Sequence, residues 1–119
     1  MKLLGKDEIL AASDMTFEEV DVPEWGGAVR VKSMSGAERD LFESFLTDIK
    51  GKDVKQNFNN VRAKLVACTA VDENGSLLFD VIDVAALGKK SAIALNRVFQ
   101  VAQKLNGIGQ DAVDELSKN

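Results

Sequence analysis

The stretch that decides the fold is residues 17–34, FEEVDVPEWGGAVRVKSM. On both sides of its centre apolar residues alternate with charged ones, as in half-buried strands: Val20 and Val22 with Glu19 and Asp21, then Val29 and Val31 with Arg30 and Lys32. The glycines of the central Pro23-Glu24-Trp25-Gly26-Gly27 supply the positive φ values that a tight reversal needs. The stretch therefore predicts an antiparallel β-hairpin whose acidic and basic faces meet, at about 0.2–1 kcal/mol per cross-strand pair.

Helical patterns flank this hairpin, and its valine face has to pack on them because an isolated hairpin is marginal in water. Residues 6–12 predict a short helix that docks on the rest through Ile9 and Leu10. Ser35-Gly36-Ala37-Glu38 has the form of a capping box and begins a helix that Gly51 can end. The apolar stripe of this helix consists of Leu41, Phe42, Phe45, Leu46 and Ile49. A second helix is predicted from Asp53 onward, with Val54, Phe58, Val61, Leu65 and Cys68 at steps of three and four.

The last third of the chain predicts a turn, a short strand and further helices. Asp72-Glu73-Asn74-Gly75 is a turn sequence, and residues 76–79 follow as a candidate strand. Asp80 or Asp83 can cap a brief helix that carries Val84 and Leu87. Ser91 caps a longer helix, Asn106-Gly107 ends it, and residues 110–117 add a final amphipathic turn or two. The buried side of the longer helix is predicted to hold Ala94, Leu95, Val98, Phe99, Ala102 and Leu105.

Together these patterns predict one domain over residues 1–119 of the α+β class, predominantly α. A β-hairpin at 17–34 packs on a small helical body, and residues 36–117 are mainly helical. A length of 119 residues suits a single core.

Composition excludes several classes of function. The chain has no histidine and one cysteine, so His-based catalytic triads, His-containing zinc sites and an internal disulfide are impossible. With 15 Lys and Arg against 19 Asp and Glu, the net charge of -4 lacks the basic footprint of a nucleic-acid binder. No apolar run approaches the roughly 20 residues that cross a bilayer, and charges at Lys2 and Lys6 exclude a signal-peptide core. We therefore expect a cytoplasmic, non-enzymatic protein without catalytic, cofactor or metal residues and without nucleic-acid or membrane partners.

Motifs that suggest chemistry fail on spacing or on missing partners. Cys68 lies on a predicted apolar stripe without an activating base, which indicates a small core residue. A calcium loop starting at Asp72 requires a liganding Asp or Asn at its fifth position and Gly at its sixth, where Ser76 and Leu77 stand. Gly88-Lys89-Lys90-Ser91 lacks the spacing of a phosphate-binding loop.

Trp25 is the strongest candidate for partner binding, and the neighbouring Glu24 is a further candidate. It occupies the predicted hairpin tip beside Glu24, where it either folds back as a lid on the core or anchors a partner as aromatic hot spots do. Phe42 and Phe45 are further candidate anchors, although their stripe positions favour the core.

Three blocks of the sequence resemble the tail assembly chaperones of long-tailed bacteriophages and their prophages. The first block is Ile9-Leu10-Ala11-Ala12-x-Asp14, and the most specific runs from Val20 to Asp40, through Pro23-Glu24-Trp25-Gly26-Gly27 and Ser35-Gly36-Ala37-Glu38-Arg39-Asp40. The third comprises Val71-Asp72-Glu73-Asn74-Gly75, Phe79-Asp80 and Leu105-Asn106-Gly107. The resemblance thus spans nearly the whole chain.

This resemblance implies a non-enzymatic assembly role in the host bacterial cytoplasm. Such chaperones bind the tape measure protein, help tail tube assembly, and are absent from the mature virion. The resemblance also implies self-association and a longer product of translational frameshifting that recruits the tail tube protein. The codons of Lys118-Asn119 can carry the slippery run for such a frameshift. The alternative is a structural head–tail joining or minor tail component that stays in the particle.

Overall fold

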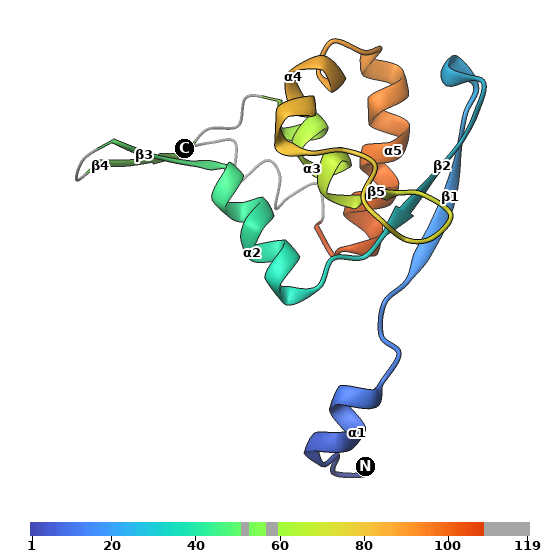
Figure 1. Cartoon of the computed structure of the whole chain (residues 1–119), viewed down its shortest axis with the longest axis vertical. Coiled ribbons are helices and arrows are strands. Elements are labelled where there is room, and N and C mark those ends of the chain that lie inside the picture. The colour runs from blue at the N-terminus through green and yellow to red at the C-terminus, as the bar shows by residue number, and fades with distance from the viewer. Residues whose placement is uncertain (51–52, 57–59, 109–119) are drawn as a thin grey trace.

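The computed structural model describes residues 1–50, 53–56 and 60–108, with side chains outside 47–59 (Figure 1). Among them the predicted α+β class, mainly α with an N-terminal β-hairpin, is confirmed. The elements in chain order are α1 (Lys6–Ala11), β1 (Phe17–Val22), η1 (Pro23–Trp25), β2 (Gly27–Lys32), α2 (Gly36–Phe45), β3 (Thr47–Lys50), β4 (Asp53–Gln56), α3 (Val61–Thr69), β5 (Ala70–Val71), η2 (Val81–Asp83), α4 (Val84–Leu87) and α5 (Ala92–Leu105).

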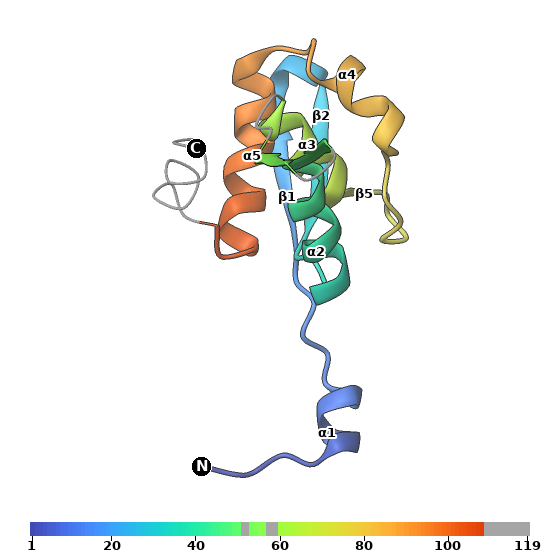
Figure 2. The same cartoon turned by 90° about the vertical axis from the view of Figure 1, so that its left-hand side faces the viewer.

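The hairpin forms as the alternation predicts. β1 and β2 pair antiparallel with Val20 opposite Val29, and Val22 and Val31 are completely buried. The valine face lies against α5 (Figures 1 and 2). β5, which the sequence patterns did not predict, adds to the free edge of β2 through Val31 opposite Ala70, so the sheet has the order β1-β2-β5.

The charged face of the hairpin differs from the prediction. Glu19 stands opposite Arg30, as expected, but Lys32 stands opposite Phe17. The Arg30 guanidinium carbon lies 4.5 Å from the centre of the Phe17 ring, and Nη1 donates to the Glu73 carbonyl at 3.1 Å. The Lys32 ammonium pairs with Glu38. Besides the contact with Phe17 inside the hairpin, Arg30 thus connects β2 to the turn after β5, and Lys32 connects it to α2.

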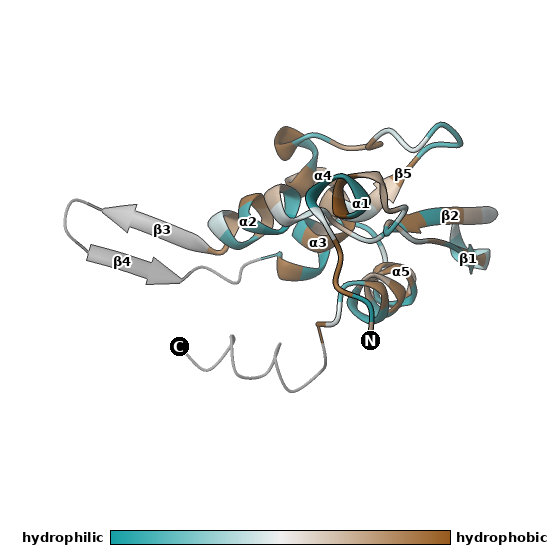
Figure 3. Cartoon of the chain, turned by 90° about the horizontal axis from the view of Figure 1, so that it is seen from below, coloured by the Kyte–Doolittle hydropathy of each residue, from teal (hydrophilic) through white to brown (hydrophobic). Residues whose placement is uncertain are grey.

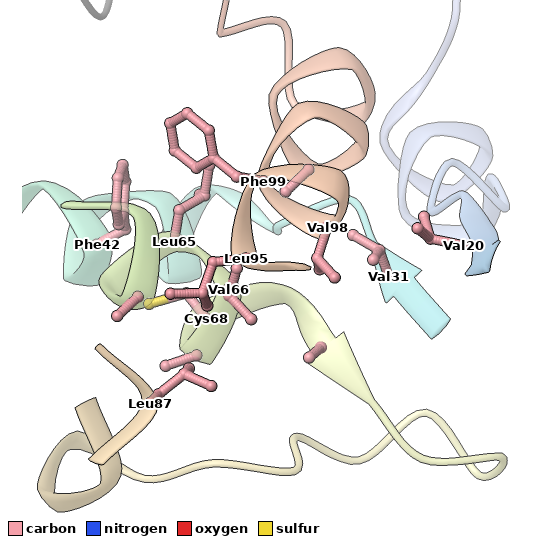
Figure 4. Packing of buried hydrophobic residues seen from close by; sticks show 14 of the residues in the cluster. Val20, Val31, Phe42, Leu65, Val66, Cys68, Leu87, Leu95, Val98 and Phe99 are labelled. Atoms are coloured by element: carbon pink, nitrogen blue, oxygen red, sulfur yellow. The ribbon is translucent and has the colours of Figure 1, made fainter. Parts of the chain in front are cut away.

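The core lies between α3, α5 and the valine face of the hairpin (Figure 4). The Ser35 and Ser91 caps are confirmed, since Ser35 Oγ accepts from the Glu38 amide at 3.2 Å and Ser91 Oγ from the Ala94 amide at 3.3 Å. The buried side of α5 matches the prediction with two differences: Leu105 is half-buried, and Gln103, which was not predicted there, is buried. The largest completely buried side chains are Leu65, Val22, Val31, Val66, Val98 and Thr69.

The helix predicted from Asp53 is wrong in its first part. β3 and β4 form a second hairpin with Ile49 opposite Val54, and the helix, α3, begins only at Val61. Ile49 and Val54 each alternate with charged neighbours, so the period of two prevailed over the helical spacing. The helix predicted from Ser35 accordingly ends at Phe45, before Gly51. Phe58 and the turn predicted at 110–117 lie outside the described residues.

Two predicted packing contacts are also wrong. Leu41, assigned to the buried stripe, is 54% exposed, because α2 contacts the core through the narrower face of Phe42, Phe45 and Leu46. α1 forms where the sequence predicts it, but none of its residues is buried. In Figures 1 and 2 it stands clear of the body, so the expected docking through Ile9 and Leu10 is absent from the described structure.

The segment between β5 and α4 follows the predicted turn. The Asp72 carboxylate accepts hydrogen bonds from the amides of Asn74 and Ser76 at 2.8 and 3.0 Å, and Gly75 has a φ of +83°. The strand predicted at 76–79 is reduced to a single bridge between Val71 and Leu77. Asp80 precedes η2, and its amide donates to the Asp83 carboxylate at 2.8 Å.

Candidate partner-binding surface

The hairpin tip is a single turn of 3₁₀ helix formed by Pro23, Glu24 and Trp25. Pro23 suits the first helical position because its φ is already fixed and its missing N–H is not needed there. Gly26 closes the turn with a φ of +75°, and its amide donates to the Pro23 carbonyl at 3.1 Å. Only Gly26 of the two predicted glycines takes a positive φ, since Gly27 already belongs to β2.

Glu24 joins this tip to α5. Arg97 donates from Nε to Glu24 Oε1 at 2.9 Å and from Nη2 to Oε2 at 3.0 Å, a two-point ion pair. The hydrogen bonds from Arg97 hold the pKa of Glu24 below its ordinary value, and those to Glu24 raise the pKa of Arg97. A second ion pair, Lys104 Nζ to Glu18 Oε1 at 3.1 Å, connects β1 to a later turn of α5. Two ion pairs therefore join the hairpin to α5, one at its tip and one on β1.

Trp25 sits on this anchored turn with 37% of its surface exposed. The turn that carries it contacts α5, so part of the ring surface is covered. A partly exposed tryptophan on a fixed turn combines a large apolar area with little conformational freedom to lose on binding.

The other two candidate residues, Phe42 and Phe45, lie on α2 and not at the hairpin tip. Phe42 is buried in the core and Phe45 packs partly against it, both from α2. In Figures 1 and 2 α2 is remote from the hairpin tip, so the structure does not bring these rings together with Trp25. Of the four candidate residues, Glu24 and Trp25 are the two that share a surface.

Asn106 connects three elements and was not predicted to do so. Its Oδ1 accepts from the Met34 amide at 2.6 Å, while Nδ2 donates to the carbonyls of Ala102 at 2.8 Å and Lys32 at 3.4 Å. Arg39 of α2 donates to the Asn106 carbonyl at 3.1 Å. Sequence analysis identified only a helix end here, because these bonds join residues far apart in the chain.

Among the open pockets of the described surface, two contain candidate lining residues for chemistry. One of about 400 Å³ lies between the start of α2 and the end of α5, and of its described lining residues only Asp14 bears a carboxylate. The other, of about 230 Å³, is lined by Arg62 and Lys90 and by no described carboxylate. A general acid/base pair of carboxylates requires two that converge in a cleft, and the described lining of neither pocket contains such a pair.

Cys68 is buried, as predicted from the stripe. Burial, with a smaller contribution from the negative charge of Glu38, raises the pKa of its thiol to about 11. Such a thiol is almost fully protonated at neutral pH and is a poor nucleophile.

Across the residues that the structure describes, no three His, Cys, Asp or Glu side chains are placed to hold a metal ion. No described helix has the length and apolar character to span a membrane.

Comparison with known proteins gives a family match. A family model described as phage tail assembly chaperone matches residues 6–119, which is almost the entire chain. No curated protein and no solved structure matches. The matched range contains the hairpin tip, α2 and α5, and hence all four candidate residues.

Proposed function

The chain belongs to the phage tail assembly chaperone family, and we propose that it binds the tape measure protein and helps the tail tube assemble around it. The family match carries this proposal. In this role the chaperone acts in the host bacterial cytoplasm, self-associates on its client, and leaves before the virion is complete. A longer product of the same gene, made by frameshifting, recruits the tail tube protein. Family membership favours a non-enzymatic role, since assembly requires binding and no reaction.

The surface proposed to meet the tape measure protein is the hairpin tip with Trp25 and Glu24. Its support is physical: Trp25 is partly exposed, and the Glu24–Arg97 ion pair fixes its turn on α5. A preorganised aromatic residue loses little entropy on binding, so it can contribute most of the energy of a small contact. Many such contacts along one client give strong overall binding even if each is weak.

Quantitative mass spectrometry of purified phage particles separates this proposal from the alternative of a structural head–tail joining or minor tail component. The proposal predicts that the chain is abundant in infected-cell lysate and depleted from particles, while tail tube and tape measure proteins are retained. A constant stoichiometric amount in particles would support the structural alternative and refute the chaperone role.

A further inference from the structure

The strand β1 forms a free edge of the three-stranded sheet. Among the described residues the strand order β1-β2-β5 leaves the outer side of β1 without a neighbouring strand (Figure 1). The helix α5 packs on the valine face of the hairpin and does not pair with this edge. Such an edge can bind an extended segment of another chain through main-chain hydrogen bonds.

The register shows which backbone groups of β1 point outward. The Ser33 amide donates to the Thr16 carbonyl at 2.9 Å, so these two residues form a hydrogen-bonded pair. Hydrogen-bonded and non-hydrogen-bonded pairs alternate in an antiparallel ladder, so Phe17, Glu19 and Asp21 direct their N–H and C=O groups away from β2. All three residues are exposed, and within the described chain their outward backbone groups form no hydrogen bond. The edge therefore presents a row of unpaired donors and acceptors.

The side chains at this edge are acidic on the open face of the sheet, and Figure 3 shows hydrophilic and apolar colour along the hairpin strands. Glu19 and Asp21 lie on the face opposite to the buried valines, and neither forms an ion pair within the described chain. Arg30 stands opposite Glu19 in the register, but its guanidinium contacts the Phe17 ring and the Glu73 carbonyl. Opposite charges in cross-strand pairs are favourable, so an added strand fits best with lysine or arginine opposite the two carboxylates.

The side of β1 that faces α5 favours apolar neighbours instead. Val20 and Val22 on this side are buried, and Glu18 beside them is already paired with Lys104 at 3.1 Å. The side chains of a strand alternate between the two faces of a sheet. A segment that complements both faces of β1 therefore alternates basic residues with apolar ones.

A second copy of β1 fits this edge poorly. Overlap of two antiparallel β1 strands centred on Glu19 places these carboxylates opposite each other, and like charges directly opposite are destabilising. Residues 29–32 have the complementary alternation, but they are already paired with strands on both sides within their own sheet. Charge thus favours a segment of a different protein.

From these observations we propose that the outer edge of β1 binds an extended segment of a partner protein as an additional antiparallel strand. The segment carries lysine or arginine opposite Glu19 and Asp21, with apolar residues between them. Main-chain hydrogen bonds supply the affinity, and the two carboxylates select the basic pattern. This surface does not include Trp25, so the proposal goes beyond binding at the hairpin tip and does not depend on it.

The test titrates a synthetic peptide, acetyl-Ser-Val-Arg-Val-Lys-Val-Ser-amide, into the isotopically labelled full-length chain and follows binding by NMR. The peptide is expected to shift the amide signals of Phe17, Glu19 and Asp21 and to slow their hydrogen exchange. N-methylation of its arginine and lysine should abolish binding, because in the antiparallel register these residues donate to β1. N-methylation of its valines is the matched control and should preserve binding, because their N–H groups point away from β1.

A charge exchange tests the selectivity. Glu19→Lys with Asp21→Lys should weaken binding of the basic peptide by about tenfold or more, because two favourable cross-strand pairs become repulsive. The same variant should bind the peptide in which glutamate replaces arginine and lysine. Asp7→Lys with Asp40→Lys makes an equal change in net charge on α1 and α2 and should bind the basic peptide as wild type does. Circular dichroism checks folding, and Asp21→Lys alone replaces the double variant if that variant unfolds.

Several results would overturn the proposal: no binding by wild type, shifts centred away from β1, an equal loss in the Asp7→Lys with Asp40→Lys control, or binding that does not depend on which residues are N-methylated. Shifts of the same amides with protein concentration alone would also overturn it, because a second copy would then occupy the edge. Trp25→Ala should bind the peptide as wild type does, so failure of tape measure binding at the hairpin tip would leave this proposal intact.

Discussion

Arg97 on α5 donates two hydrogen bonds, from Nε and Nη2, to the carboxylate of Glu24 at the hairpin tip. The two residues are 73 positions apart in the sequence. Hydrogen bonding to Arg97 lowers the pKa of Glu24, so the folded state favours the carboxylate. The stabilisation from this pair is present above the pKa of Glu24 in the unfolded chain and is lost as the pH falls through the lower folded pKa.

Replacement of this carboxylate should therefore have a pH-dependent effect. We expect Glu24→Gln to lower Tm slightly at neutral pH, because the pair is exposed, and to match wild type once the pH lies below the folded pKa. Thermal melts across that range measure the difference. Glu19→Gln, on the preceding strand β1 and outside the salt bridges of the described residues, is the control and should show no such convergence. A Glu24→Gln deficit that grows in acid would contradict the ion-pair account.

Leu65 tests the position of the core. It is completely buried in α3, so Leu65→Ala should lower the free energy of unfolding by about 2–5 kcal/mol through lost burial and a residual cavity. Leu41→Ala makes the same change at an exposed position of α2 and should cost within about 0.5 kcal/mol. Urea unfolding measures both. Equal losses would mean that α2 and α3 are packed differently from the structure described.

Asn106 tests the connection between the end of α5 and the start of α2. Asn106→Ala removes the acceptor of the Met34 amide and should lower the free energy of unfolding by about 1–3 kcal/mol. Asn96→Ala, within α5, removes an amide that forms no hydrogen bond within the described chain and serves as the control. Chemical denaturation compares the two, and an Asn106 effect no larger than that of Asn96 would contradict the proposed linkage.

Cys68 reports on opening of the core. Because its thiol is buried and has a pKa of about 11, a thiol reagent near pH 8 should modify the native chain far more slowly than the chain in denaturant. Absorbance of the released chromophore follows the reaction, and the absence of any other cysteine makes the signal specific. Rapid stoichiometric labelling of the native protein would show that Cys68 is accessible.

Elements with a strong local pattern were predicted correctly from the sequence. Valine alternation specified the hairpin, and Ser91, Asn106 and Gly107 marked both ends of α5. The strands at 47–50 and 53–56 were not predicted, because Ile49 and Val54 fit a strand period as well as a helical one and only their pairing decides. The ion pair of Glu24 with Arg97 was missed for a related reason: contacts between distant residues leave no local periodicity. Trp25 and Glu24 were recognised as candidates from turn chemistry, whereas burial of Phe42 depended on how α2 packs.

Binding of the tape measure protein by the hairpin tip can be measured in one affinity titration. Immobilised tape measure protein is titrated with the wild-type chain, with Trp25→Ala, and with Phe17→Ala. Phe17, 44% exposed at the other end of β1, is the matched aromatic control. The account predicts that Trp25→Ala raises Kd by about 30-fold or more, a hot-spot loss of about 2 kcal/mol, with little change in Tm. It predicts near-wild-type affinity for Phe17→Ala. Absence of binding by wild type, or a Trp25→Ala loss matched by an equal loss of folding stability, would contradict it.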